Sequence, residues 1–304
     1  MPDAIDDGFA RRLFAGSGYV VGEFRCPAWA RRWRTENWIG PRAHIVVPGT
    51  AVAIAADGSD PHVCTANEVL AYDAGVCYRR RLVSDEGDRC VYFEVSDELA
   101  ARLGLVSGRG RHGPRLRFAS LQSSAYLHHR LLHAVIAAAP TSVDPLSVDE
   151  WGLALLARTA AHVSAHPRQV ATRGNGAPAQ RKAVEQVVSI LATRLADPLT
   201  LADLGALVHY SPYFLARVFR RHTGSTIGRY RMHLRLRRSL ELVLAVGPGS
   251  DLTEVAAMYG FSSHSHYTRA FREAFGCPVW LRCSPRRRRR RGRRTQAGRS
   301  AGHR

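Results

Sequence analysis

The sequence lacks the features that mark a chain for a membrane or for secretion. No apolar run approaches the roughly 20 residues that a membrane-spanning helix needs. The first residues, MPDAIDDGFARRLF, carry acids where a secretory signal is basic, and no apolar segment follows them. The six cysteines are scattered, without a Cys-x-x-Cys pair, so a disulfide framework is not indicated. We therefore expect a soluble cytoplasmic protein with reduced thiols and no membrane contact.

Acidic residues are also few. The chain has 25 Asp and Glu against 44 Lys and Arg, which gives a net charge of +19. From Arg282 to Arg304 there are eleven arginines and no acid, and from 181 to 281 thirteen basic residues face seven acidic ones. Because the positive charge is concentrated in the C-terminal third, we expect a polyanionic partner, namely double-stranded DNA.

No catalytic pattern stands out in the first 165 residues. They hold no acid/base set with diagnostic spacing, so we predict that the protein is not an enzyme and needs no cofactor. The ligands of a metal site would have to come from Cys26, His44, His62, Cys64 and Cys90. No His-x-His pair occurs there, which favours core or surface roles. An enzyme or metal-dependent barrel tethered to DNA remains a competing hypothesis, and metal bound to the purified protein would support it.

Residues 18–118 have a β-rich pattern. Short apolar or alternating runs, separated by turn signals such as Pro48-Gly49, predict strands at Tyr19–Cys26, His44–Val47, Val52–Ala55, Val69–Tyr72, Val76–Val83 and Cys90–Val95. Short strands at this spacing are typical of a barrel or a double-sheet roll.

Helical periodicity then replaces the β pattern and sets the expected domains. Helices are predicted at 121–139 and 148–163, and we expect them to form a homodimer seam, with packing inside the domain as the alternative. Residues 166–179 carry two prolines and two glycines without periodicity, which indicates a linker. We therefore predict a domain at 1–165, an all-helical domain at 180–282 and a disordered Arg-rich tail at 283–304. The fold class is α+β.

The helical domain contains an internal repeat. The stretch LADLGALVHYSPYFLARVFRRHTG at 201–224 recurs as LTEVAAMYGFSSHSHYTRAFREAFG at 252–276, with one extra residue in the second turn. Each copy has the pattern of a helix-turn-helix. Thr200 with Asp203, and Asp251 with Glu254, resemble capping boxes, while Ser211-Pro212 and Ser262 or Ser263 open the second helices.

The turns and the helix crossings use small or permissive residues. Gly260 supplies the positive φ that the bend of the second copy needs, and His209 occupies that position in the first. Ala206 and Ala257 are predicted to let the paired helices approach closely.

Each second helix has an apolar face and a polar face. Arginine with small polar groups near a helix N-terminus suits the major groove, where Arg pairs with guanine edges. The residues presented on the polar faces are Tyr213, Ala216, Arg217, Arg220, Arg221, His264, Ser265, Thr268, Arg269 and Arg272. Of these, Arg220, Arg221 and Arg272 are predicted to contact phosphates. A surface salt bridge is the alternative role for the arginines.

A long helix at 226–246 is predicted to join the two copies. At about 1.5 Å per residue it spans roughly 30 Å, comparable to the ~34 Å of one DNA turn. Its expected buried side is Ile227, Tyr230, Leu234, Leu240, Val243 and Leu244. Its arginines, Arg231, Arg235, Arg237 and Arg238, are expected in solvent or near phosphates.

Residues 181–282 resemble the DNA-binding domain of AraC/XylS-type transcriptional regulators. The stretch GFSSHSHYTRAFREAFGCP at 260–278 carries the similarity, with the pattern G-F-S-x-x-S-x-[FY]-x-R-x-F-[KR]. The resemblance implies a bilobed helical domain that contacts the bases of double-stranded DNA through the N-terminal half of each second helix. The positions that match are Tyr213, Ala216 and Arg217 in the first copy, and His264, Ser265, Thr268 and Arg269 in the second. RNA polymerase is the expected protein partner, whether transcription rises or falls.

The N-terminal region resembles, more diffusely, the cupin-like effector or dimerisation domain of such regulators, on Phe24-Arg-Cys26, Tyr78 and Gly87-Asp-Arg-Cys90. This implies a small-molecule effector and a homodimer. The Arg-rich tail could add nonspecific DNA affinity. One alternative is a general DNA-coating protein whose binding depends on that tail. Another is that the tail arises from a reading-frame error.

Overall fold

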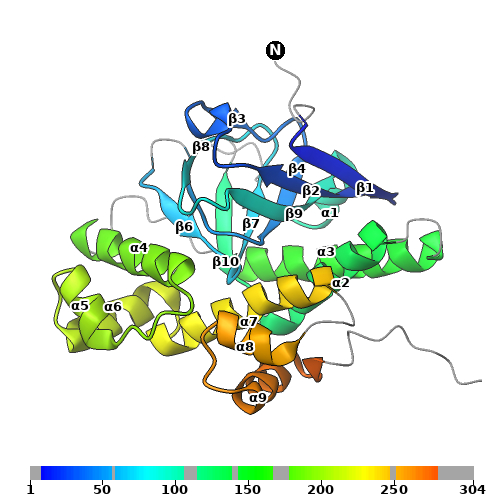
Figure 1. Ribbon diagram of the computed structural model, residues 1–304. Coiled ribbons are helices and arrows are strands. Elements are labelled where there is room, and N and C mark those ends of the chain that lie inside the picture. Colours follow the sequence, from blue (N-terminus) through cyan, green and yellow to red (C-terminus); the bar gives the residue numbers. More distant parts are fainter. Residues whose placement is uncertain are drawn as a thin grey trace, which may run out of the picture.

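The computed structural model describes residues 8–56, 59–105, 115–138, 143–166, 178–246 and 251–279. It has an N-terminal part built on two β-sheets and a C-terminal part of helices (Figure 1). The predicted α+β organisation, a β-rich N-terminal part followed by a helical C-terminal part, is confirmed. The proposed linker at 166–179 and tail at 283–304 lie mostly or wholly outside the described residues, and α4 begins at Pro178.

All strand pairs in the two sheets are antiparallel. A six-stranded sheet has the order β1-β2-β9-β4-β7-β10, and a four-stranded sheet has the order β3-β8-β5-β6. The bounds of the first are β1 Ala10–Gly16, β2 Tyr19–Cys26, β4 Ala43–Pro48, β7 Glu68–Tyr72, β9 Asp88–Val95 and β10 Leu116–Ser120. Those of the second are β3 Asn37–Trp38, β5 Val52–Ala56, β6 His62–Cys64 and β8 Cys77–Leu82.

The six-stranded sheet is buried on both faces. Side chains alternate along a strand, so on β7 Leu70 and Tyr72 join a small cluster shared with β5 and β8 of the other sheet. Val69 and Ala71 of the same strand join the main core on the opposite face. Helices α2 (Ser123–Ala138) and α3 (Pro145–Ala165) cover that opposite face (Figure 1). The sheet is thus the middle layer of a three-layer domain.

The six predicted strands and both predicted helices of this part are present. Four strands, β1, β3, β6 and β10, and the short helix α1 (Asp97–Arg102) were not predicted. In three of these strands the alternation of apolar and polar residues that predicts a strand does not develop. The strands β3 and β6 have only two and three residues, and no residue of β1 is fully buried.

Within the described residues, the C-terminal part contains six helices. Their bounds are α4 Pro178–Thr193, α5 Leu201–Leu207, α6 Pro212–Thr223, α7 Ile227–Val246, α8 Leu252–Met258 and α9 His264–Phe275. In Figure 1 α4, α5 and α6 lie at one end of the long helix α7, and α8 and α9 lie toward the other. The bilobed arrangement follows from the repeat, since each lobe is one helix pair.

Candidate nucleic-acid interface

The first helix pair is fixed by caps that the sequence encodes. The Thr200 hydroxyl accepts from the Asp203 backbone N–H at 3.1 Å, and the Asp203 carboxylate accepts from the Thr200 N–H at 2.8 Å. The Thr200 hydroxyl, which also donates to the Asp203 carboxylate at 2.6 Å, and the Thr200 backbone N–H lower the pKa of Asp203. The Ser211 hydroxyl caps α6 by accepting from the Phe214 N–H, and Pro212 follows at the first helical position. The predicted caps of this pair are confirmed.

The second pair has a similar N-cap, but the predicted capping box of Asp251 with Glu254 is only half formed, because the Glu254 side chain does not accept from the Asp251 N–H. The Asp251 carboxylate accepts from the backbone N–H groups of Thr253 and Glu254 at the start of α8. Of the two candidate serines, Ser263 caps α9 by accepting from the His266 N–H at 3.1 Å. Both α6 and α9 have 12 residues, and both end at a left-handed glycine, Gly224 and Gly276. The repeat seen in the sequence is therefore a structural repeat.

The bend of each pair contains one residue with positive φ. Gly260 has φ +73°, and His209 has φ +60°, the one positive φ outside glycine among the described residues. The predicted equivalence of these positions is confirmed. Gly260 is irreplaceable for a second reason: an added Cβ would lie 2.8 Å from the backbone of Ala196. His209 already accommodates its Cβ, so only its backbone conformation is unfavourable.

We expect His209→Gly to raise the free energy of unfolding by up to about 1 kcal/mol. Glycine removes the cost of about 1–2 kcal/mol for a side chain in the left-handed region, and the greater freedom of glycine in the unfolded chain offsets part of this gain. Urea unfolding at equilibrium measures the change. A loss of stability would show that the His209 side chain makes a contact worth more than the strain.

The close approach of the paired helices involves different residues from those predicted. Ala206 and Ala257 are exposed, so the prediction that they lie at the crossing is wrong. The buried small residues are Gly205 and Ala256, one position earlier in each copy. A Cβ on Gly205 would lie 2.6 Å from the Tyr210 carbonyl oxygen. A shift of one residue turns a helix by about 100°, which carries the alanine out of the contact.

The outer faces of α6 and α9 present the predicted contact residues to solvent. Tyr213 is 79% exposed. The side chains that are exposed are Tyr213, Arg217, Arg220, Arg221, His264, Ser265, Arg269 and Arg272, and those that are half-buried are Ala216 and Thr268. The opposite faces hold Leu215, Val218, Phe219, Tyr267, Phe271 and Phe275 in the core. The structure thus separates the two faces of each helix as predicted, but Ala216 offers only a methyl group.

The arginines on these faces keep their charge available. Within the described residues no carboxylate lies in an ion pair with Arg217, Arg220, Arg221, Arg269 or Arg272. The guanidinium of Arg217 instead stacks 5.3 Å from the centre of the Phe214 ring. The alternative role in surface salt bridges therefore has no support in this structure. Five uncompensated positive charges on two matched helices suit a polyanion.

The connecting helix α7 is more deeply buried than its pattern predicts. Tyr230, Leu234, Leu240 and Val243 are buried as predicted, and Ile227 and Leu244 are half-buried. The prediction that its arginines are solvated or near phosphates is wrong. Arg235 donates to the carbonyls of Leu195 and Gly260, and Arg231 to that of Leu199. These carbonyls belong to loops and helix ends, where no backbone N–H can reach them.

Arg237 of the same helix is inserted into the N-terminal domain. Its side chain is 1% exposed and donates to the carbonyl oxygens of Ala66 and Leu121. Its guanidinium also lies 5.1 Å from the centre of the Tyr126 ring. Burial lowers the pKa of Arg237 to about 10, although nearby Tyr126, Tyr230 and Glu68 act in the opposite direction. The guanidinium stays protonated at neutral pH, so a buried charged side chain joins α7 to the N-terminal part.

Other polar contacts extend this interface along α7 and α4. Glu241 accepts from the Tyr126 hydroxyl at 2.7 Å and pairs with Arg130. His62 of β6 lies between Glu185 of α4, at 2.7 Å, and Glu68, at 3.1 Å. Burial alone would lower the pKa of His62, but the two carboxylates raise it to about 10. The helix pairs are thus held against the β-domain by several charged contacts that the sequence did not reveal.

The predicted dimer helices have partners within the chain. Helix α2 packs on α3, α7 and α9, and its residues Tyr126, Leu127, Leu132 and Ile136 are buried. This is the packing named as the alternative to a dimer seam. Dimerisation through α2 and α3 stays a prediction that no contact here tests.

The candidate metal ligands do not converge. Buried His44 has its pKa lowered by desolvation, and its Nδ1 lies 3.0 Å from the Arg42 carbonyl. His62 is occupied by its two carboxylates. No group of three or more His, Cys, Asp or Glu with metal-binding geometry occurs in the described part of the chain. Over the same residues, no helix is long and apolar enough to cross a membrane.

Comparison with known proteins agrees with this geometry. A family described as a helix-turn-helix domain matches residues 204–279. The chain is 30% identical over 95 residues to the HTH-type transcriptional regulator GbdR of Pseudomonas aeruginosa, covering 31% of this chain and 25% of that protein. The right origin-binding protein of Escherichia coli is 36% identical over 97 residues, 31% of this chain and 32% of that one. Residues 204–279 thus match a helix-turn-helix domain, and they are similar to the corresponding part of transcriptional regulators.

The similarity extends to a relative of which it covers most of the length. The multiple antibiotic resistance protein MarA of Salmonella typhimurium is 27% identical over 96 residues, which cover 31% of this chain and 73% of that protein. The chain spans only about a quarter to a third of the length of GbdR and the right origin-binding protein. Among solved structures, fatty-acid-bound ToxT of Vibrio cholerae covers 87% of the chain and 94% of its own, with 10% identity and a TM-score of 0.35.

Proposed function

We propose that the protein is a sequence-specific DNA-binding transcription regulator without enzymatic activity, acting in the cytoplasm. The observation that carries the proposal is the pair of matched 12-residue helices, α6 and α9, with exposed and uncompensated arginines on their outer faces. The resemblance to AraC/XylS-type regulators supports the same function. The 20 residues of α7 span roughly 30 Å, close to one DNA turn, so the two helices can enter successive major grooves.

Within that function the contact residues divide into two classes. Those near the helix N-termini reach base edges, and we assign Tyr213, Ala216, Arg217, His264, Ser265, Thr268 and Arg269 to this class. Arg220, Arg221 and Arg272 lie further along the helices and meet phosphates, which position the protein without specifying sequence. Because Ala216 has no polar reach, the first helix reads fewer base pairs than the second.

The N-terminal domain is proposed to bind a small effector and to support a homodimer, and RNA polymerase is the proposed protein partner. The interface supports control by an effector, because the β-domain contacts the connecting helix α7 through Arg237 and contacts α4 through His62. The competing hypothesis of a DNA-coating protein driven by residues 283–304 predicts that a chain ending at 282 no longer binds DNA, whereas the proposed function predicts that this chain keeps its site preference.

We expect Arg269→Ala and Arg220→Ala to weaken DNA binding in different ways. Arg269→Ala should cost about 1–3 kcal/mol on a site selected from random duplexes and relax base choice at one position. Arg220→Ala should weaken binding to all sequences alike and reduce the slope of log K against log salt by about 1. Fluorescence anisotropy at four salt concentrations separates the two effects. Equal loss on selected and random DNA for Arg269→Ala would contradict its base-reading role.

A further inference from the structure

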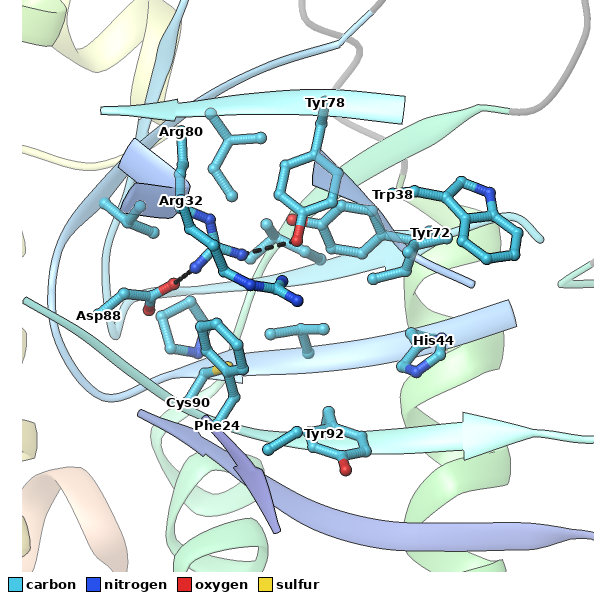
Figure 2. Close-up of a pocket in the computed structure, with 17 residues that line it drawn as sticks. Phe24, Arg32, Trp38, His44, Tyr72, Tyr78, Arg80, Asp88, Cys90 and Tyr92 are labelled. Carbon is cyan, nitrogen blue, oxygen red and sulfur yellow. Dashed lines mark hydrogen bonds and ion pairs between the residues drawn. The ribbon is translucent and has the colours of Figure 1, made fainter. Parts of the chain in front are cut away.

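Arg80 lies in a cavity between the two β-sheets of the N-terminal part, and its charge is paired there (Figure 2). The guanidinium donates to the Asp88 carboxylate at 3.0 Å and to the Tyr78 hydroxyl at 2.7 Å. Arg229 of α7 and Arg269 of α9 differ from Arg80, because both are exposed. In the part of the chain that the structure describes, neither of them forms an ion pair with a carboxylate. These two charges line a groove at the surface.

The groove has a volume of about 720 Å³ and lies between the N-terminal part and the helical part. One wall consists of residues 67–68 and 120–124, where α2 begins. The other wall consists of residues 223–225 at the end of α6, the N-terminal half of α7, and one flank of α9. The groove therefore extends from one of the proposed DNA-contacting helices to the other.

A duplex bound by both α6 and α9 passes across the space between them. Its major groove is about 12 Å wide and admits one helix, so a phosphate backbone runs along each flank of that helix. The flank of α9 that lines the surface groove carries His266, Arg269 and Glu273, at the spacing of one helix face. None of the residues of α8, all of which the structure describes, lines the groove. The backbone of one DNA strand can therefore run along it.

Three arginines of the groove have no carboxylate partner among the described residues. Arg229 and Arg269 line it and are exposed, and Arg237 lines it from a buried position. Arg237 donates to two backbone carbonyls and to the Ser123 hydroxyl, so no carboxylate neutralises its charge. A buried charge is screened less by water and salt than an exposed one. All three cations therefore act on the occupant of the groove.

The negative charge along the groove is smaller. Glu68 pairs with His62 at 3.1 Å, whereas Glu273 is exposed and has no cationic partner within the described part of the chain. His233 is neutral at pH 7, because burial and two neighbouring arginines lower its pKa to about 4. The excess of arginine over unpaired carboxylate favours an anion. The DNA backbone is the anion that binding through α9 brings to this place.

The N-terminal part supplies hydrogen-bond donors to the same groove. Gln122 and Ser124 line it and are exposed. Ser123, between them, is buried, and its hydroxyl lies 2.9 Å from Nδ1 of His233 in α7. This contact fixes the start of α2 against α7, so the Gln122 amide and the Ser124 hydroxyl are held at the groove. Amide and hydroxyl side chains are common partners of DNA phosphates.

We propose that the start of α2 forms part of the DNA interface, with Gln122 and Ser124 contacting the phosphate backbone that Arg229 and Arg269 hold in the groove. The proposal rests on the DNA-binding function proposed above and extends its surface onto the N-terminal part. Arg269 lines the groove and also lies on the outer face of α9, so the two surfaces are continuous. A movement of the N-terminal part then changes the DNA contacts directly.

Charge substitutions at Ser124 test this contact, and Ser164 is the matched control. Ser164 is an exposed serine of α3 that does not line the groove. We expect Ser124→Arg to tighten binding to the selected site and to random duplex by about fivefold, and Ser124→Glu to weaken both by a similar factor. Ser124→Arg should also steepen the slope of log K against log salt by about 0.9. The same substitutions at Ser164 should change either affinity less than about twofold at about 0.15 M salt, where the Debye length is about 8 Å.

Fluorescence anisotropy over a series of salt concentrations measures these affinities, and the Tm of each variant reports on its fold. Arg229→Met should weaken binding to both DNAs and reduce the salt slope by about 1. Ser124 variants that bind like the Ser164 variants, weaker binding by Ser124→Arg, or unchanged binding by Arg229→Met would each overturn the extended interface. If the parent protein prefers the selected site in those cases, the proposed function stands. A parent protein without any site preference would instead overturn the proposed function.

Discussion

Gly260→Ala is expected to destabilise the protein by about 2–5 kcal/mol. The left-handed conformation costs a side chain about 1–2 kcal/mol, and forcing a methyl group into a packed site costs about 1–3 kcal/mol more. The added Cβ would lie 2.7 Å from Arg235 Nη2 and 2.8 Å from the backbone of Ala196. Because Gly260 forms the bend between α8 and α9, DNA affinity should fall together with stability. Urea unfolding and anisotropy on the selected site measure the two effects.

Gly228→Ala is the matched control for this substitution. Gly228 lies in α7 with ordinary φ, and a Cβ there would meet no atom within 4 Å. The same added methyl group should stabilise the helix by up to about 1 kcal/mol. If Gly260→Ala behaved like Gly228→Ala, the bend of the second helix pair would differ from the one described here.

Arg237→Met is expected to lower the free energy of unfolding by about 2–4 kcal/mol. The substitution leaves the buried carbonyls of Ala66 and Leu121 without a donor, and each unsatisfied group costs about 1–3 kcal/mol; relief of the desolvated charge offsets part of the loss. Because the contact joins α7 to the β-domain, the helix pairs should also separate from it more readily. Limited proteolysis should then cleave between the two parts faster than in the parent protein.

Arg229→Met on the same helix provides the comparison. Arg229 is exposed, so its replacement should change stability by less than about 0.5 kcal/mol. Buried charges are sometimes replaced by apolar groups without loss. If Arg237→Met were as stable as Arg229→Met and equally resistant to protease, Arg237 would not be the contact that holds α7 against the β-domain.

The helix pairs could be predicted because their signals are local. A cap such as Ser211 acts on an N–H three residues away, and the positive φ of His209 and Gly260 belongs to one residue. Because the sequence contains two copies of the repeat, the caps and the bend could each be recognised at two equivalent places. The prediction that Ala206 lies at the helix crossing is wrong because the crossing uses the neighbouring small residue, Gly205, and the sequence does not show which of the two positions faces the partner helix.

The interface between the two parts could not be predicted, because its partners are far apart in sequence. Arg237 donates to carbonyls of residues 66 and 121, and a backbone carbonyl has no residue-specific signature. From the sequence alone, the arginines of a basic helix beside a DNA-binding motif are therefore expected in solvent or near phosphates. His62 is a similar case, since Glu68 and Glu185 were not recognisable as its partners. The cavity around Arg80 likewise depends on strands that meet only in the folded sheets.

Binding of the chain ending at residue 282, and of the full chain, to its selected DNA site and to random duplex at fixed salt tests the central claim most directly. We expect both chains to prefer the selected site by about 10³-fold or more, with the tail raising affinity for both DNAs. Replacement of Arg217 and Arg269 together by alanine should remove most of that preference. A shortened chain that binds both DNAs equally, or a preference that survives the double replacement, would show that α6 and α9 do not read the DNA.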